Sequence, residues 1–74
     1  MSFFKSFELE SGHEVLIVKN FDSDNDAYIT QMFVENKKVI QTATVSFQQE
    51  EDRNNMFNNY NLQSAQEFAN FMID

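Results

Sequence analysis

Three aspartates occupy alternate positions in the segment DSDND, residues 22–26, and this spacing matches the first three ligands of a calcium-binding EF-hand loop. The match ends there. Ala27 stands where such a loop needs a glycine for its sharp turn, and Phe33 stands where it needs a bidentate glutamate. The residues that follow alternate as in a strand, not as in a helix. We therefore predict a solvated acidic turn and no calcium sensor, with weak cation binding at this turn as the open alternative.

The only imidazole in the chain is His13, which follows Gly12 in an expected turn. General acid–base catalysis needs such a side chain beside a nucleophile or carboxylate in a rigid surround, and a turn offers little of this. The chain has no Cys and a single Gly, which excludes a thiolate zinc site and a glycine-rich phosphate-binding loop. We predict that the protein is not an enzyme and that it uses no metal or cofactor.

Carboxylates are the functional groups that this chain has in excess, with 12 Asp and Glu against 5 Lys and Arg and a formal net charge of -7 on 74 residues. Such a charge disfavours contact with nucleic acid or anionic membranes and favours a basic partner. The candidate partner-binding carboxylates form two main groups, with a weaker third group around the first turn. They are Asp22, Asp24 and Asp26, then Glu50, Glu51 and Asp52, and, as the weaker group, Glu8, Glu10 and Glu14.

The spacing of these carboxylates favours one kind of partner. Side chains two residues apart on an extended segment lie about 6.5–7 Å apart, and one DNA strand places a phosphate about every 3.4 Å. A row of carboxylates could thus imitate every second phosphate and occupy the basic, nucleic-acid-binding surface of another protein. The competing interpretation is an ordinary acidic surface that keeps a small protein soluble and monomeric.

Aromatic residues, nine Phe and two Tyr, raise the question of base stacking. Stacking surfaces combine their rings with a basic groove. Here Lys37 and Lys38 are the only two basic residues that are adjacent in the sequence, and the others are isolated. We predict that the rings are core, where full burial of each stabilises the fold by about 1.5–3 kcal/mol. The predicted core includes Phe7, Leu9, Ile17, Ile29, Phe33, Val45, Phe47, Phe57, Phe68 and Phe71.

Hydrophobic periodicity predicts a single small α+β domain over residues 1–74, with a four-stranded antiparallel meander followed by two short helices. The strands are predicted at residues 3–10, 14–21, 27–35 and 39–48, and helical structure at about 50–73. Short connections between consecutive strands favour the meander. Neither helix can bury its apolar stripe alone, so both are expected on one face of the sheet.

Two local signals mark the expected boundary between the helices. Asn61 is predicted to end the first helix in the left-handed conformation. Residues 64–67, with the sequence SAQE, have the capping-box pattern that begins a helix.

The targeting signals of the chain are few. No apolar run follows the first six residues, and the longest run, residues 15–18, is too short to span a bilayer, so neither a signal peptide nor a membrane span is expected. The absence of Cys fits a reducing compartment. We expect a cytoplasmic protein, bacterial or, for a viral protein, in the host cytoplasm.

Two hypotheses about function follow. The first is a small acidic, non-catalytic interaction protein that docks on a basic macromolecular surface without binding nucleic acid or membrane directly. In composition, as a short, cysteine-free, acidic, Asn- and Phe-rich chain, the sequence resembles proteins encoded by bacteriophages or mobile elements, and this resemblance favours an inhibitor that imitates nucleic acid. The alternative is a structural, self-assembling module that forms a homodimer through an edge strand or the C-terminal helix, with no charged partner.

Overall fold

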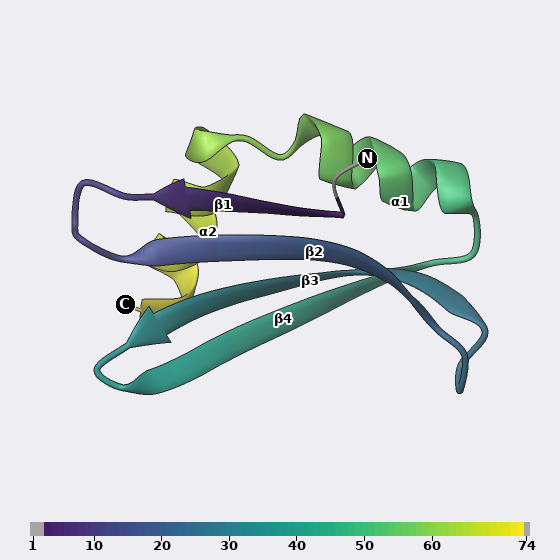
Figure 1. Ribbon diagram of the computed structural model, residues 1–74, viewed down its shortest axis with the longest axis horizontal. Helices are drawn as coiled ribbons and strands as arrows, with labels where there is room; N and C mark the ends of the chain where they lie inside the picture. Colours follow the sequence, from purple (N-terminus) through teal and green to yellow (C-terminus); the bar gives the residue numbers. More distant parts are fainter. Residues whose placement is uncertain (1–2, 74) are drawn as a thin grey trace.

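The computed structural model describes residues 3–73 and has one four-stranded sheet followed by two helices (Figure 1). The α+β meander predicted from the sequence is confirmed, because the strands lie in chain order and every neighbouring pair is antiparallel. The elements are β1 (Phe4–Glu8), β2 (Glu14–Asp22), β3 (Ala27–Asn36), β4 (Val39–Phe47), α1 (Glu50–Asn59) and α2 (Leu62–Ile73).

The turn between β1 and β2 is longer than the sequence indicated, so β1 is shorter than predicted. Leu9 leaves the strand, and its N–H donates to the His13 carbonyl at 2.8 Å while its own carbonyl accepts from the Gly12 N–H at 2.9 Å. Gly12 has a φ of 93°, a conformation that only glycine adopts without strain.

The turn between β3 and β4 has only two residues, Lys37 and Lys38, with Asn36 opposite Val39 in the register. Both lysines have positive φ, 53° and 71°. Two-residue hairpin turns of this kind strongly prefer Asn-Gly, because a left-handed conformation costs an ordinary L-residue about 1–2 kcal/mol. The two lysines are therefore locally unfavourable in this turn.

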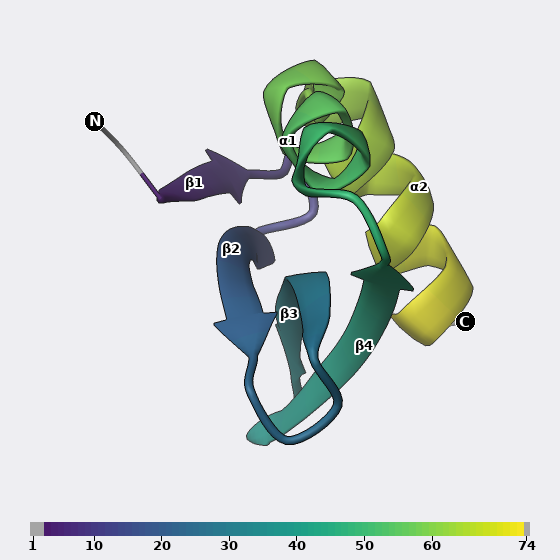
Figure 2. The same ribbon diagram turned by 90° about the vertical axis from the view of Figure 1, so that its right-hand side faces the viewer.

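Both helices cover the same face of the sheet, and within residues 3–73 no helix lies on the other face (Figure 2). On the covered face Val15 lies opposite Val34 and Ile17 lies opposite Met32, and Val15 and Ile17 are completely buried. The side chains of α1 and α2 close this layer from above. The buried core residues are Leu9, Val15, Ile17, Met32, Val34, Phe57, Tyr60, Ala65 and Ala69.

Seven of the ten predicted core residues are buried or pack against the core, and Phe33, Phe47 and Phe71 do not belong to it. Leu9, Ile17, Ile29 and Phe57 are buried, while Phe7, Val45 and Phe68 pack partly buried against the core. Phe33 is half-buried on the face opposite the helices, and Phe47 is half-buried at the end of β4.

At Phe71 the core prediction was wrong, because the side chain is 83% exposed. Helix α2 faces the sheet with the small side chains of Ala65 and Ala69, which are buried. Since each residue turns an α-helix by about 100°, Phe71 lies roughly 200° around the helix from Ala69. The residue therefore points into solvent although its sequence spacing fits an apolar stripe.

The boundary between the helices also differs from the prediction. Asn61 does not end α1 in the left-handed conformation; Tyr60 follows α1 with φ -67° and ψ 127°. Asn61 instead begins α2, because its Oδ1 accepts the Ser64 N–H at 2.9 Å while its own N–H donates to Ser64 Oγ at 3.3 Å. Ser64 thus lies inside the helix, and the predicted capping box at residues 64–67 was placed one turn too late. Asn is among the best N-cap residues, which explains the choice.

Candidate functional site

Six of the 12 carboxylates lie on two segments at the same end of the molecule, the right-hand end in Figure 1, which faces the viewer in Figure 2. The turn between β2 and β3 lies at this end, and so does the first turn of α1, because β2 and β4 run in the same direction. We call this surface the acidic end. It consists of Asp22, Asp24, Asp26, Glu50, Glu51 and Asp52.

The three weaker candidates, Glu8, Glu10 and Glu14, lie around the turn between β1 and β2 and hence at the opposite end of the sheet. Glu8 and Glu14 line an open cavity of about 650 Å³ together with Lys37 and Lys38. Two cations therefore offset the carboxylates there, so the structure separates this group from the other six.

Rows of carboxylates spaced two residues apart on an extended segment are not formed at the acidic end. Asp24 and Asp26 lie in a turn, with Asp26 at φ 52°, while residues 50–52 belong to a helix. The spacing of about 6.5–7 Å expected for a strand does not apply to either group. The negative charge is concentrated, but it does not follow the repeat of a nucleic-acid backbone along a strand.

Asp22 has a structural role in the acidic turn. Its Oδ2 accepts from the Asn25 side-chain amide at 2.7 Å and its Oδ1 accepts from the Asp24 N–H at 3.1 Å. These bonds, that of the Asn25 side chain above all, lower the pKa of Asp22. Within residues 3–73 no group of three or more His, Cys, Asp or Glu side chains is placed to hold a metal ion.

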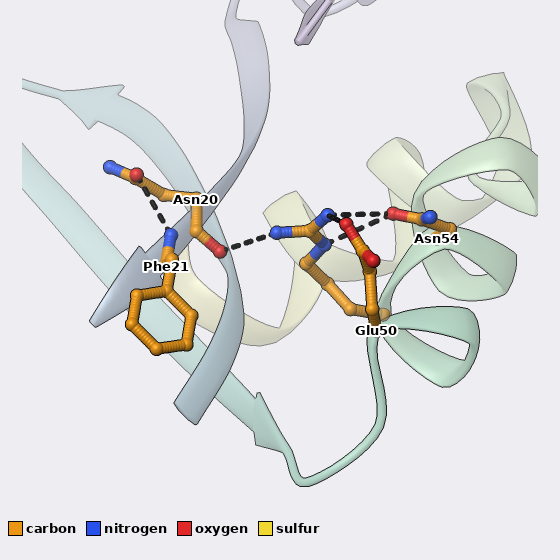
Figure 3. A network of polar contacts seen from close by, with 5 residues as sticks. Asn20, Phe21, Glu50 and Asn54 are labelled. Carbon is orange, nitrogen blue, oxygen red and sulfur yellow. Dashed lines mark hydrogen bonds and ion pairs between the residues drawn. The ribbon is translucent and has the colours of Figure 1, made fainter. Parts of the chain in front are cut away.

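A buried arginine joins α1 to the sheet just behind the acidic end. Arg53 is only 8% exposed, and its Nη1 donates to the Asn20 carbonyl at 2.7 Å (Figure 3). Its Nη2 donates to Asn54 Oδ1 at 2.9 Å and lies 3.3 Å from Glu50 Oε2, and its guanidinium lies over the Tyr28 ring. This cation near the acidic end therefore makes its hydrogen bonds inside the fold.

Two lysines are occupied in the same way on the ring of Phe57. Lys5 and Lys19 each place Nζ 5.0 Å from the centroid of this ring. Lys5 Nζ also donates to the carbonyls of Phe57 at 2.7 Å, Asn58 at 3.1 Å and Tyr60 at 3.2 Å, at the C-terminal end of α1. The sequence analysis did not predict these roles. Within residues 3–73, Lys37 and Lys38 make no such contacts.

Three aromatic residues, Phe21, Tyr28 and Phe47, are register partners on β2, β3 and β4 at the acidic end. The Phe21 and Tyr28 rings pack edge to face with centroids 5.0 Å apart, and Phe21 is 42% exposed. We call these three residues the aromatic row. The sequence indicated this row only through the alternation of β2, which places Phe21 on the same face as Ile17 and at the end of the strand, one residue before Asp22.

The one histidine lies in the turn that the sequence predicted, and it contacts a serine. Ser11 Oγ lies 2.9 Å from His13 Nδ1, two residues away on an exposed turn. The same turn is closed by the backbone hydrogen bonds of Leu9. Both side chains belong to one tight turn, and the contact is accounted for by turn geometry.

The buried hydroxyl of Tyr60 gives a testable pH dependence. It has no hydrogen-bond partner among residues 3–73, and burial raises its pKa to about 12 from an ordinary value of 10.0. The folded state holds the proton more tightly than the unfolded state, so this contribution to stability is complete below pH 10 and is lost as the pH rises towards about 12. We expect the melting temperature of the native protein to fall over this range more than that of Tyr60→Phe, in circular dichroism melts. Equal alkaline slopes for the two proteins would contradict this.

Comparisons with protein-family models, curated proteins and solved structures give no match for this chain. The described residues form a small sheet with two helices on one face, and carboxylates of two segments lie at one of its ends. Neither helix in the described part of the chain is long and apolar enough to cross a membrane.

Proposed function

We propose that this protein acts by binding, with the acidic end as its docking element and a basic surface on another protein as its partner. The observation that carries the proposal is the placement of six carboxylates on two segments at the same end of the fold, while the nearby Arg53 is buried and hydrogen-bonded to the sheet. A concentrated charge of one sign accelerates association with a surface of the opposite sign.

The aromatic row supports docking on a protein surface. Stable interfaces depend on a few anchors, often aromatic, surrounded by polar contacts that exclude water. Phe21 is such a partly exposed ring; it precedes Asp22 at the end of β2, with the two side chains on opposite faces of the sheet. A basic surface with a small apolar pocket is therefore the partner that fits this end.

Among basic surfaces, we propose those that bind nucleic acid. Such surfaces are rich in Lys and Arg that contact phosphates, and carboxylates can take the place of the phosphates. The protein would then be an inhibitor that excludes nucleic acid from its target. The amount of negative charge and its position at one end of the sheet support this proposal. Inhibition of this kind requires negative charge on the docking surface but not a regular row of carboxylates.

The test compares two triple charge reversals that change the net charge equally. Asp24→Lys, Glu51→Lys and Asp52→Lys alter the acidic end, sparing Asp22, which closes the turn, and Glu50, which pairs with Arg53. The control reverses Glu8, Glu10 and Glu35, which are exposed on strands or turns at the other end.

Affinity capture from bacterial lysate at low salt, followed by a salt step, should recover a basic protein with the native chain and with the control, but not with the acidic-end variant. With that protein purified, we expect association to be slower by about tenfold or more for the acidic-end variant, and the salt dependence to be flatter. The proposal would be contradicted by equal association rates for the two variants, or by a captured protein whose binding does not weaken as the salt concentration rises.

A further inference from the structure

The outer strand β4 has an unprotected edge. It is the last strand of the sheet and forms the lower margin of the molecule in Figure 1. Its hydrogen bonds within residues 3–73 go to β3 and to no other segment. The Gln41 Oε1 atom on this strand is buried and also has no partner in that part of the chain. An edge of this kind presents a row of free backbone donors and acceptors for another strand.

The sequence of β4 lacks the devices that usually protect an edge. All nine residues, VIQTATVSF, pair with β3 without a bulge, and none of them is charged or proline. Native edges are normally kept short, charged, bulged or covered. The other edge, β1, is five residues long and carries Lys5 and Glu8. In a chain with a net charge of -7, the neutrality of β4 is the exception.

Opposite charges lie at the two ends of β4. Lys37 and Lys38 immediately precede it, and Glu50, Glu51 and Asp52 follow it after a short bend. The two lysines occupy positive-φ positions that suit Asn or Gly better, at 53° and 71°. Retaining strained residues at a turn is a reason to look for a role, and their charge is what distinguishes them from the preferred residues.

We propose that β4 pairs antiparallel with β4 of a second copy of this chain, about a two-fold axis at Ala43. This is the register in which all nine residues of each strand find a partner. Thr42 then lies opposite Thr44 of the second copy, and exposed Val39 lies opposite Phe47, an aromatic and β-branched pair of the kind that stabilises sheets. Both helical layers fall on the same face of the joined sheet, because partners have the same parity.

The flanking charges identify a second copy as the occupant. Antiparallel pairing places Lys37 and Lys38 of each chain beside the segment that begins α1 in the other, where Glu51 and Asp52 lie. The symmetry makes this contact twice. A neutral central strand lets two acidic chains meet without opposed carboxylates, and the turn at residues 22–26, which joins β2 and β3, remains outside the contact.

A charge-swap experiment tests the contact between copies. We expect the native protein to show a reversible monomer–dimer equilibrium in sedimentation velocity over a wide concentration range. Lys37→Glu with Lys38→Glu, and separately Glu51→Lys with Asp52→Lys, should each weaken the homodimer by about tenfold or more. An equimolar mixture of the two double variants should restore dimers, because each reversed site meets its complement in the other chain. Circular dichroism establishes that each variant is folded.

A second pair of variants tests the register. Thr42 and Thr44 are both exposed on the face without helices. Thr42→Glu with Thr44→Glu should abolish the dimer, because like charges face each other twice, whereas Thr42→Lys with Thr44→Glu should retain it. A native protein that is monomeric at every concentration, a mixture that does not restore dimers, or equal dimerisation of the two Thr variants would overturn the proposal. The Thr variants leave the acidic end intact, so loss of the dimer with retained capture of a basic protein would separate this inference from the proposed function.

Discussion

Replacing Phe57 with alanine should destabilise the protein by about 3–5 kcal/mol, which is the usual loss for a buried phenylalanine. Phe57 is 3% exposed and packs from α1 into the core. The ammonium groups of Lys5 and Lys19 both lie against its ring. Single domains are stable by only about 5–15 kcal/mol, and a chain of 74 residues lies towards the small end of the domain size range. We therefore expect this variant to be largely or wholly unfolded near 37 °C.

Phe71→Ala is the matched control, because it removes the same atoms from a residue that is 83% exposed. Its free energy of unfolding should stay within about 0.5 kcal/mol of the native value. Urea denaturation followed by circular dichroism measures both. A Phe71 variant as unstable as the Phe57 variant would mean that α2 faces the sheet differently or that Phe71 is covered by another chain.

The order of the strands could be predicted from the sequence because each strand of a meander needs only local information. A period of two, broken by short turns, fixes both the strands and their antiparallel pairing. The same topology also implies that the ends of β2 and β4 meet at one end of the sheet. The predicted meander therefore already implied that the Asp22 turn and the start of α1 lie at the same end of the sheet, although the sequence analysis did not predict it.

The orientation of α2 could not be predicted in the same way. Its apolar residues surround more than one side of the helix, so spacing alone does not tell whether alanines or phenylalanines face the sheet. Close packing against β3 selects the small side chains of Ala65 and Ala69. Phe71 is therefore exposed to solvent, and its hydrophobic side chain gave no indication in the sequence that it would be.

The internal roles of the basic residues were equally hidden, because each depends on a contact between distant segments. Lys5 meets the end of α1 across 52 residues, and Arg53 meets Asn20 across 33. A count of charges treats these side chains as surface groups that offset the carboxylates. In the fold they make contacts with the backbone and with aromatic rings, and Arg53 also pairs with Glu50, so they hold elements together as well as offsetting charge.

Replacing Lys5 with methionine should lower the free energy of unfolding by about 2–3 kcal/mol, although no large apolar contact is lost. The last carbonyls of a helix have no intrahelical donor, and the helix dipole places partial negative charge there. Lys5 Nζ donates to the carbonyls of Phe57 and Asn58 in the last turn and of Tyr60 just after it, and two of these bonds are partly buried. Methionine keeps the length of the side chain but removes the ammonium donor from all three carbonyls, leaving that of Phe57 with only the Tyr60 N–H.

Lys19→Met separates the two interactions that Lys5 makes. Both ammonium groups lie 5.0 Å from the centroid of the Phe57 ring, but the three carbonyls are bonded by Lys5. The Lys19 variant should lose only the cation–π contribution, about 0.5–1 kcal/mol. Denaturant unfolding of the two variants gives the difference. Equal losses would mean that the ring contact, and not the end of the helix, is what Lys5 stabilises.

Arginine at position 5 provides the last test of this geometry. An ammonium group has three donors that can be directed at converging acceptors, whereas a guanidinium presents its donors in a planar fork. The carbonyls of Phe57, Asn58 and Tyr60 converge on one nitrogen. Lys5→Arg keeps the charge but cannot reproduce that convergence, so its stability should lie between those of the native protein and Lys5→Met. If it equals the native protein, charge at the helix end suffices and the three hydrogen bonds contribute little beyond it.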